Sequence, residues 1–359
     1  GHVSRWVLGG QKSDRSTTHK HAPARLPSVS PVDSGLLSIF ATAIAPIIAI
    51  AAVGYALGRT QDVDAGPLNT ITVYVLAPAL VFHSVATTPL GGETLLWLAI
   101  GVTGFTLTMA TLAEGIGRLA GETEPLLGAF VLTSSFSNAG NYGIPLSDFA
   151  FGSVGRSTAV LFIVVQSVLL YTLGVYLAAR GRDESALAGV RRVFSIPLVY
   201  AVVVGLVAGS LGLLPPAESA TMETVGMVGN ASIPVMLLLL GIQLSNAELG
   251  AAMGSVVRAN ALKMVLAPAV AVGVALLSLA VFARLGLAGP QATVTRVFVL
   301  ECATPAAVTP LILVGEFSGG SIEGVTPESY VSTVVFTSTL VSIPTLTALI
   351  AILQAGVVL

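Results

Sequence analysis

Charged residues are scarce in this chain of 359 residues, which contains 16 Lys or Arg and 18 Asp or Glu. They make up 9% of the sequence, against about 25% in soluble domains, while 54% of the residues are hydrophobic. This balance excludes a soluble globular domain. The formal net charge of −2 at pH 7 provides no basic field for a polyanion, so nucleic acid is excluded as a partner.

Cysteine and the common catalytic motifs are also missing. The single Cys302 excludes an internal disulfide and a multi-cysteine metal site, and no metal or other cofactor is expected. The sequence contains no H-E-x-x-H, G-x-S-x-G or Walker A motif, so ATP-driven pumping and the common hydrolase mechanisms lack their parts. An intramembrane protease would need paired aspartates or a Ser/His pair, and only one aspartate falls within an apolar run. We therefore expect no enzyme.

Long apolar runs are abundant. From Leu36 onward, runs of about twenty residues recur, and each is long enough to cross the bilayer as a helix. We predict ten such spans, near residues 36–57, 67–88, 94–117, 125–151, 157–179, 194–214, 221–244, 252–282, 292–316 and 328–356. The polar, proline-containing segment 1–35 is predicted to be a disordered tail. The expected class is an all-α, multi-pass integral protein of the cell membrane.

Basic residues in the short loops predict the orientation. Seven arginines fall on the side of the 181–193 loop and three on the other side, which favours a cytoplasmic position for this loop. The loop separates a first repeat, 36–180, from a second repeat, 194–359. Because each has five spans, two homologous repeats would have opposite topologies.

The fourth span has an unusual composition for a membrane helix. The segment SSFSNAGNYGIPL, residues 134–146, contains Gly140, Gly143 and Pro145. Proline removes one helical donor and glycine lowers helix propensity, so the freed backbone groups must be satisfied by protein or water. We predict an unwound break that lines a cavity.

The ninth span predicts a second break at the matching position of the other repeat. Its segment ECATPAAVTP, residues 301–310, contains Pro305 and Pro310. Two facing breaks would create half-helix N-termini, whose partial positive charge favours an anion without any arginine. The alternative is a pair of proline kinks that merely bend packed helices.

Four segments resemble those of the auxin efflux carrier family, which includes the plant carriers of that hormone and is related to the bile-acid/sodium symporters. They are APALVFHSVATTP (77–89), SNAGNYGIPL (137–146), VVQSVLLYTL (164–173) and ATPAAVTP (303–310). The resemblance implies two inverted five-helix repeats, with helices four and nine broken and crossing at mid-membrane. It also implies that Asn138, Gln166 and Tyr171 line the substrate site and that Pro145 and Pro305 are the crossover prolines.

Asn141 lies in the same break as Asn138 and is a further substrate-binding candidate. Gln166 and Tyr171 are five residues apart, so on a regular helix they would approach one ligand only from adjoining faces. Either side chain could instead form an interhelical hydrogen bond.

Ionisable residues within spans are functional candidates because burying charge in lipid is expensive. His83 could carry a coupling proton or could be a neutral structural imidazole. Asp148 and Glu301 could each take up a proton, or each could be a structural group that caps a half-helix end. Arg258 and Lys263 are expected to extend to the cytoplasmic face, with pairing of Lys263 to a site carboxylate as the alternative.

The expected function is secondary transport of a small organic anion, such as a carboxylate, by alternating access. The driving force would be the membrane potential or a proton gradient. Sodium-coupled symport is the main alternative, since Asn138, Asn141, Glu301 and Thr304 could supply oxygen ligands together with unwound carbonyls. A membrane sensor that does not transport is a further alternative. The oligomeric state stays open, a homodimer included.

Overall fold

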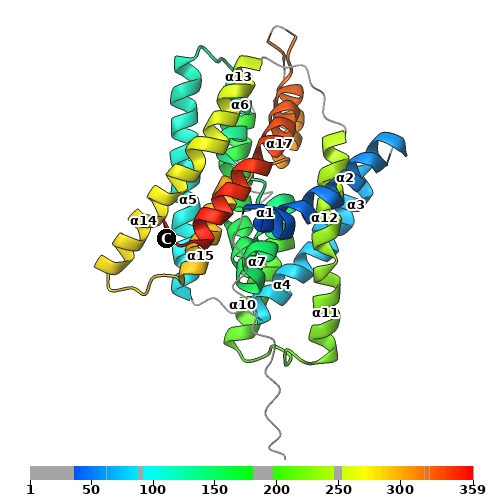
Figure 1. Cartoon of the computed structure of the whole chain (residues 1–359), viewed down its shortest axis with the longest axis vertical. Helices are drawn as coiled ribbons and strands as arrows, with labels where there is room; N and C mark the ends of the chain where they lie inside the picture. Colours follow the sequence, from blue (N-terminus) through cyan, green and yellow to red (C-terminus); the bar gives the residue numbers. More distant parts are fainter. Residues whose placement is uncertain are drawn as a thin grey trace, which may run out of the picture. The chain divides into compact units, whose positions relative to one another are not determined.

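The computed structural model of the chain describes residues 36–61, 63–87, 92–180, 197–245, 253–318, 320–322 and 324–358. Every regular element in these ranges is a helix (Figure 1). The predicted tail 1–35 and loop 181–193 lie outside the described residues. The all-α class is therefore confirmed for the part of the chain that the structure describes.

Two groups of helices can be distinguished by their mutual packing. In the first, which we call the flanking group, α2 packs along α12, and α4 packs along both α10 and α11 (Figure 1). Its elements are α1 (Leu36–Ile39), η1 (Phe40–Ile44), α2 (Ala45–Thr60), α3 (Ala65–Ile71), η2 (Thr72–Leu76), α4 (Ala77–Thr87), α10 (Pro197–Ser210), α11 (Ala220–Asn230) and α12 (Ser232–Ser245).

The second group, called the crossing group, contains the interrupted helices. Here α5 packs on α6, α7 and α14, while α15 packs on α7 and α14. Its elements are α5 (Gly92–Leu119), α6 (Leu126–Ser135), η3 (Ala139–Gly143), α7 (Ile144–Leu169), η4 (Leu170–Gly174), α8 (Val175–Ala178), α13 (Met253–Ala261), η5 (Leu262–Leu266), α14 (Ala267–Arg284), α15 (Ala292–Ala303), α16 (Thr309–Phe317) and α17 (Pro327–Gln354).

Small residues allow the closest helix contacts. A Cβ atom on Gly241 of α12 would collide with the Ala51 carbonyl of α2, and one on Gly54 would collide with the Leu238 carbonyl. Such backbone approach is typical of helices that associate in lipid. Large apolar side chains, including Leu37, Met227 and Val265, are exposed on the outer faces, as expected of a surface that contacts lipid.

Seven helical stretches in the described ranges are long and apolar enough to cross a membrane. They are Leu36–Thr60, Ala65–Thr87, Gly92–Leu119, Ala139–Ala178, Ala220–Ser245, Met253–Arg284 and Pro327–Gln354. The count is below the ten predicted spans for physical reasons. The ninth predicted span is divided into α15 and α16, the sixth is represented by the 14-residue α10, and the fourth is divided between α6 and the start of α7.

Gly152 separates the predicted fourth and fifth spans within α7. Its φ of 64° lies in the left-handed region, which glycine adopts without the steric cost that a Cβ atom brings. The helix direction therefore changes at this residue although helical hydrogen bonding continues on both sides. Residues 144–151 thus fall in the predicted fourth span, and most of the rest of α7 falls in the predicted fifth.

Candidate functional site

The two broken helices meet at a short antiparallel pairing of backbone. After α6 ends at Ser135 and α15 ends at Ala303, both chains are extended, and Ser137 pairs with Ala306. The Asn138 N–H donates to the Pro305 carbonyl over 2.8 Å, and the Ala307 N–H donates to the Phe136 carbonyl over 3.0 Å. The predicted breaks thus satisfy part of each other's backbone, and the interpretation as two simple proline kinks is wrong.

Side chains satisfy the backbone groups that point away from this pairing. Gln166 Nε2 donates to the Ser137 carbonyl over 2.8 Å, and Gln166 Oε1 accepts from the Ser137 N–H over 3.1 Å. On the other chain, Ser338 Oγ accepts from the Ala306 N–H over 3.1 Å. Because a buried backbone group without a partner is costly, these side chains stabilise the crossing itself. Gln166 therefore forms the interhelical hydrogen bond that was its structural alternative.

A cavity of about 190 Å³ lies beside the crossing. Its wall includes all four predicted substrate-binding residues, Asn138, Asn141, Gln166 and Tyr171, together with Gly140. Asn138 is 95% buried, and its side-chain amide nitrogen has no hydrogen-bond partner in the described part of the chain. A buried amide donor without a partner is a group that a ligand oxygen could satisfy.

The ends of two half-helices also line this cavity. Asn138 immediately precedes η3, whose residues Gly140 and Asn141 are on the wall. Val308 and Thr309, at the start of α16, lie on the wall as well. Helix N-termini carry partial positive charge and free N–H groups, which favour anions.

The opposite wall of the cavity comes from the flanking group. Asn69, Thr72 and Val73 contribute from α3 and η2, and Met236 and Gln243 contribute from α12. None of these residues was predicted from the sequence, because none stands in a break or a recognisable motif. No lining residue that the structure describes carries a charged side chain. The cavity thus has a largely apolar, uncharged wall with a few polar groups, and it forms where the two helix groups meet.

Gln166 and Tyr171 both line the cavity although they are five residues apart in sequence. Gln166 lies in the regular part of α7, where its carbonyl accepts from the Leu170 N–H, and Tyr171 lies in the π-helical turn η4. Their approach to one ligand from adjoining faces stays a prediction.

Glu301 lies behind the crossing and does not line the cavity. Its carboxylate is fully buried, and Ser147 Oγ donates to Glu301 Oε1 over 2.5 Å. Glu301 Oε2 has no partner in the described residues. A Cβ atom on Gly143 would collide with this carboxylate, so glycine allows the close approach.

Lys263 is the residue for which sequence reasoning was wrong. We expected its ammonium to extend to the membrane surface, but the side chain is fully buried. Lys263 Nζ donates to Ser137 Oγ over 2.6 Å and to the Cys302 carbonyl over 2.9 Å. It also lies 5.6 Å from the centre of the Phe105 ring. Arg258 on the same helix is 40% exposed and pairs with Glu122, as its position near the helix end suggested.

His83 and Asp148 do not line the cavity. Asp148 Oδ1 lies 3.5 Å from Arg156 Nε, and Arg156 Nη1 donates to Asn230 Oδ1 over 2.5 Å. His83 packs against Gly226 of α11 in the flanking group. Neither residue has a hydrogen bond or ion pair to Glu301 in the described part of the chain, although Ser147, which precedes Asp148, donates to Glu301.

The remaining predicted residues take structural positions. Pro305 supplies the carbonyl that accepts from Asn138, whereas Pro310 occupies the first turn of α16, where its missing N–H is tolerated. Pro145 lies at the junction of η3 and α7, two residues after η3 ends. Pro305 and Pro310 thus flank the break before α16, whereas Pro145 follows a helical π-turn.

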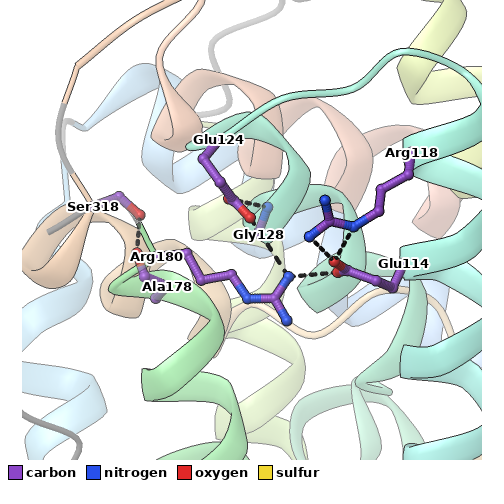
Figure 2. A network of polar contacts seen from close by, with 7 residues as sticks. All are labelled: Glu114, Arg118, Glu124, Gly128, Ala178, Arg180 and Ser318. Atoms are coloured by element: carbon purple, nitrogen blue, oxygen red, sulfur yellow. Dashed lines mark hydrogen bonds and ion pairs between the residues drawn. The ribbon is translucent and has the colours of Figure 1, made fainter.

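An ion-pair network joins helix ends of the crossing group (Figure 2). Glu114 accepts from Arg118 and from Arg180, at 2.7 Å and 2.5 Å, and Arg180 also lies 3.5 Å from Glu124. Glu124 Oε2 accepts from the Gly128 N–H at the start of α6. Arg118 and Arg180 therefore lie together. The basic-residue pattern predicts that both are on the same side of the membrane.

Long apolar helices around a broken-helix site define a multi-pass integral membrane transporter. The family described as "Membrane transport protein", which is the auxin efflux carrier family, matches residues 39–192 and 185–350. The chain belongs to this family, which is a transport family and not an enzyme family.

Relatives support the same class. An "Uncharacterized transporter" of Methanothermobacter thermautotrophicus is 25% identical over 304 residues, covering 84% of this chain and 94% of the relative. A protein of Rhizobium meliloti named "Putative malonate transporter" is 25% identical over 329 residues, covering 87% of this chain and 95% of the relative.

Proposed function

We propose that this protein is a secondary transporter of small organic anions, with short dicarboxylates of the malonate type as the first substrates to test. The observation that carries the proposal is the cavity between the two helix groups, lined by two half-helix starts and by buried amide groups. Its volume of about 190 Å³ is below the range of 300–1,000 Å³ typical of drug-sized ligands, which favours a small substrate. The relative named for malonate adds support for this substrate class.

Asn138 is the proposed principal ligand. Its amide nitrogen is buried, unpartnered and adjacent to the N–H groups of η3, so one carboxylate could accept from both. Asn141 and Tyr171 would contact the rest of the substrate, while Gln166 would hold the crossing in shape. The absence of charged groups from the described cavity wall leaves recognition to dipoles and amides, as half-helix sites allow.

The proposed topology has ten spans in two inverted repeats, 36–180 and 194–359, with the loop 181–193 in the cytoplasm. In this scheme α6 with the start of α7, and α15 with α16, are the fourth and ninth spans and cross at mid-membrane. The antiparallel pairing of Ser137 with Ala306 supports the crossing. Alternating access would then be a displacement of the crossing group against the flanking group, which exposes the cavity to either side in turn.

Glu301 is the proposed coupling group. A buried carboxylate oxygen without a partner is costly unless the group holds a proton or a cation. A proton on Glu301 during one half of the cycle would couple anion movement to a proton gradient. His83 and Asp148, which have no hydrogen bond or ion pair to Glu301 in the described residues, would not take part.

Reconstituted vesicles provide the test. Proteoliposomes that contain the purified protein should accumulate radiolabelled malonate when a potential or pH gradient is imposed. Unlabelled malonate added outside should then exchange with the radiolabelled malonate inside. Other short carboxylates offered in the same assay would define the substrate range. Malonate flux that is lost when a large organic cation replaces sodium would favour the sodium symporter. Malonate binding without flux would favour a sensor. Either outcome would contradict the proposal.

A further inference from the structure

We propose that the Lys263 ammonium is a fixed internal cation of the helix crossing, so that the crossing assembles without a dissolved cation. Lys263 belongs to η5 and reaches both broken segments, since Nζ donates to Ser137 Oγ over 2.6 Å and to the Cys302 carbonyl over 2.9 Å. One ammonium thus connects the fourth and ninth predicted spans. It is fully buried, and no ion pair joins it to a carboxylate in the described part of the chain.

The position has the properties of a cation site. Cys302 is the penultimate residue of α15, and Ser137 follows the end of α6 by two residues. The last carbonyls of a helix lack intrahelical partners, and the C-terminal end carries partial negative charge. In transporters with broken helices, such carbonyls and half-helix C-terminal ends coordinate the coupling cation. Here the lysine ammonium already donates to these oxygens.

The hydrogen bonds show a site built for a donor. Ser137 Oγ donates its own proton to the Cys302 carbonyl over 3.1 Å, so its lone pairs remain to accept from Lys263. The Phe105 ring, 5.6 Å from Nζ, presents its electron-rich face on another side. Since Ser137 also lines the cavity, the charge lies one residue behind the wall of the proposed substrate site.

The test compares thermal unfolding of purified variants in sodium chloride and in choline chloride at equal ionic strength. Wild type should melt at the same temperature in both salts, because its cation is covalently attached. Lys263→Ala opens a space beside the two oxygens. In choline chloride the melting temperature of this variant should be about 6 °C or more below that of wild type, and sodium or ammonium should recover part of this loss.

Lys263→Met is the matched control, because its side chain fills the space without providing a charge. It should lose stability to a similar extent and show no difference between the two salts. Equal unfolding of Lys263→Ala in both salts would overturn the proposal. So would an equal sodium response of the alanine and methionine variants, which would locate the cation elsewhere, or a wild type that itself needs sodium.

A second variant keeps the proposal testable if Lys263→Ala cannot be purified. Lys263→Gln keeps an amide donor near the same oxygens but no charge, and Arg258→Gln removes a charge from the same helix away from the crossing. We expect malonate exchange to fall at least tenfold in Lys263→Gln and to stay near wild type in Arg258→Gln; equal rates in the two variants would overturn the proposal. Only the flux measurement rests on the proposed function, because the melting experiment requires no substrate.

Discussion

At the scale of single residues, the site separates groups that hold the crossing from groups that remain available. Gln166 uses both polar atoms of its amide on the backbone of Ser137. Asn138 lies on the same cavity wall, but its amide nitrogen has no partner in the described residues. Two amides of similar chemistry therefore have different expected roles, one structural and one for ligand binding.

Asn138→Ala should lower malonate transport at least tenfold, equivalent to about 1.4 kcal/mol of lost binding or transition-state stabilisation. The variant should remain folded, because the side-chain nitrogen of Asn138 has no hydrogen bond in the described residues that the substitution would remove. Vesicle uptake and melting temperature measured on the same preparation would separate the two effects. Asn260→Ala is the matched control, since this asparagine bonds to Thr337 and does not line the cavity. Wild-type uptake by purified Asn138→Ala would mean that the site is elsewhere.

Glu301→Gln should abolish the response of malonate flux to an imposed pH gradient while flux driven by membrane potential remains. The amide keeps the size of the carboxyl group beside Ser147 but cannot exchange a proton. Vesicles loaded at one pH and diluted into another, with the potential clamped, provide the measurement.

His83→Gln is the comparison variant for this experiment. His83 packs on Gly226, and Asp148, its nearest sequence-based candidate partner, is paired with Arg156. The ratio of pH-driven to potential-driven flux should therefore stay unaltered in His83→Gln. Selective loss of the pH response in this variant, with Glu301→Gln unaffected, would reverse the assignment of the coupling group.

The candidate site was only partly predictable at this scale. Asn138, Asn141, Gln166 and Tyr171 were identified from the break and the family resemblance, and all line one cavity. Lys263 was not, because a lysine near an arginine in an apolar helix has the pattern of a side chain that extends to the surface. Its real partners, Ser137 and Cys302, are far away in sequence, so only the tertiary structure brings them to it.

At the scale of elements, interrupted helices and π-helical turns supply the site. Proline and glycine in the fourth and ninth spans predicted the interruptions. The π-turns η2, η3 and η4 provide lining residues, and η5 carries Lys263, but no sequence signal predicted them. A π-turn depends on how neighbouring helices accommodate one extra residue, and this depends on packing more than on local propensity.

Pro305→Ala should reduce transport about fivefold, or ~1 kcal/mol, with a smaller effect on melting temperature. Alanine restores a backbone donor and permits α15 to continue, which would withdraw the residue 305 carbonyl from the Asn138 N–H. Pro310→Ala is the control, since Pro310 lies in the first turn of α16, where proline leaves no donor missing. A Pro305→Ala variant that unfolds in detergent yet transports normally in membranes would identify Pro305 as a packing residue only.

At the scale of the whole molecule, alternating access requires the two helix groups to move as units. The crossing group has internal ion pairs at one end, including Glu114 with Arg180 and Glu122 with Arg258 (Figure 2 shows the former). The hydrogen bond from Arg156 Nη1 to Asn230 Oδ1 joins α7 of the crossing group to α11 of the flanking group. A contact between groups that move relative to each other must break during the cycle, whereas contacts within a group need not.

Cross-linking can therefore distinguish movement between groups from movement within a group. In an Arg156→Cys/Asn230→Cys double variant, a short bifunctional thiol reagent should fix the two groups in one state. Malonate flux in vesicles should then fall to roughly a tenth or less, because an equilibrium held at one end cannot cycle. A cleavable reagent should restore flux when it is reduced.

The control pair is Glu122→Cys/Arg258→Cys, which links two parts of the crossing group at an accessible helix end. If the crossing group moves as a unit, this double variant should transport malonate at the same rate before and after cross-linking. The native Cys302 is fully buried, so the reagent should reach the introduced thiols first. Retained flux in the cross-linked Arg156/Asn230 pair would mean that the cavity opens by local rearrangement beside a fixed interface, and displacement of the crossing group would then be wrong.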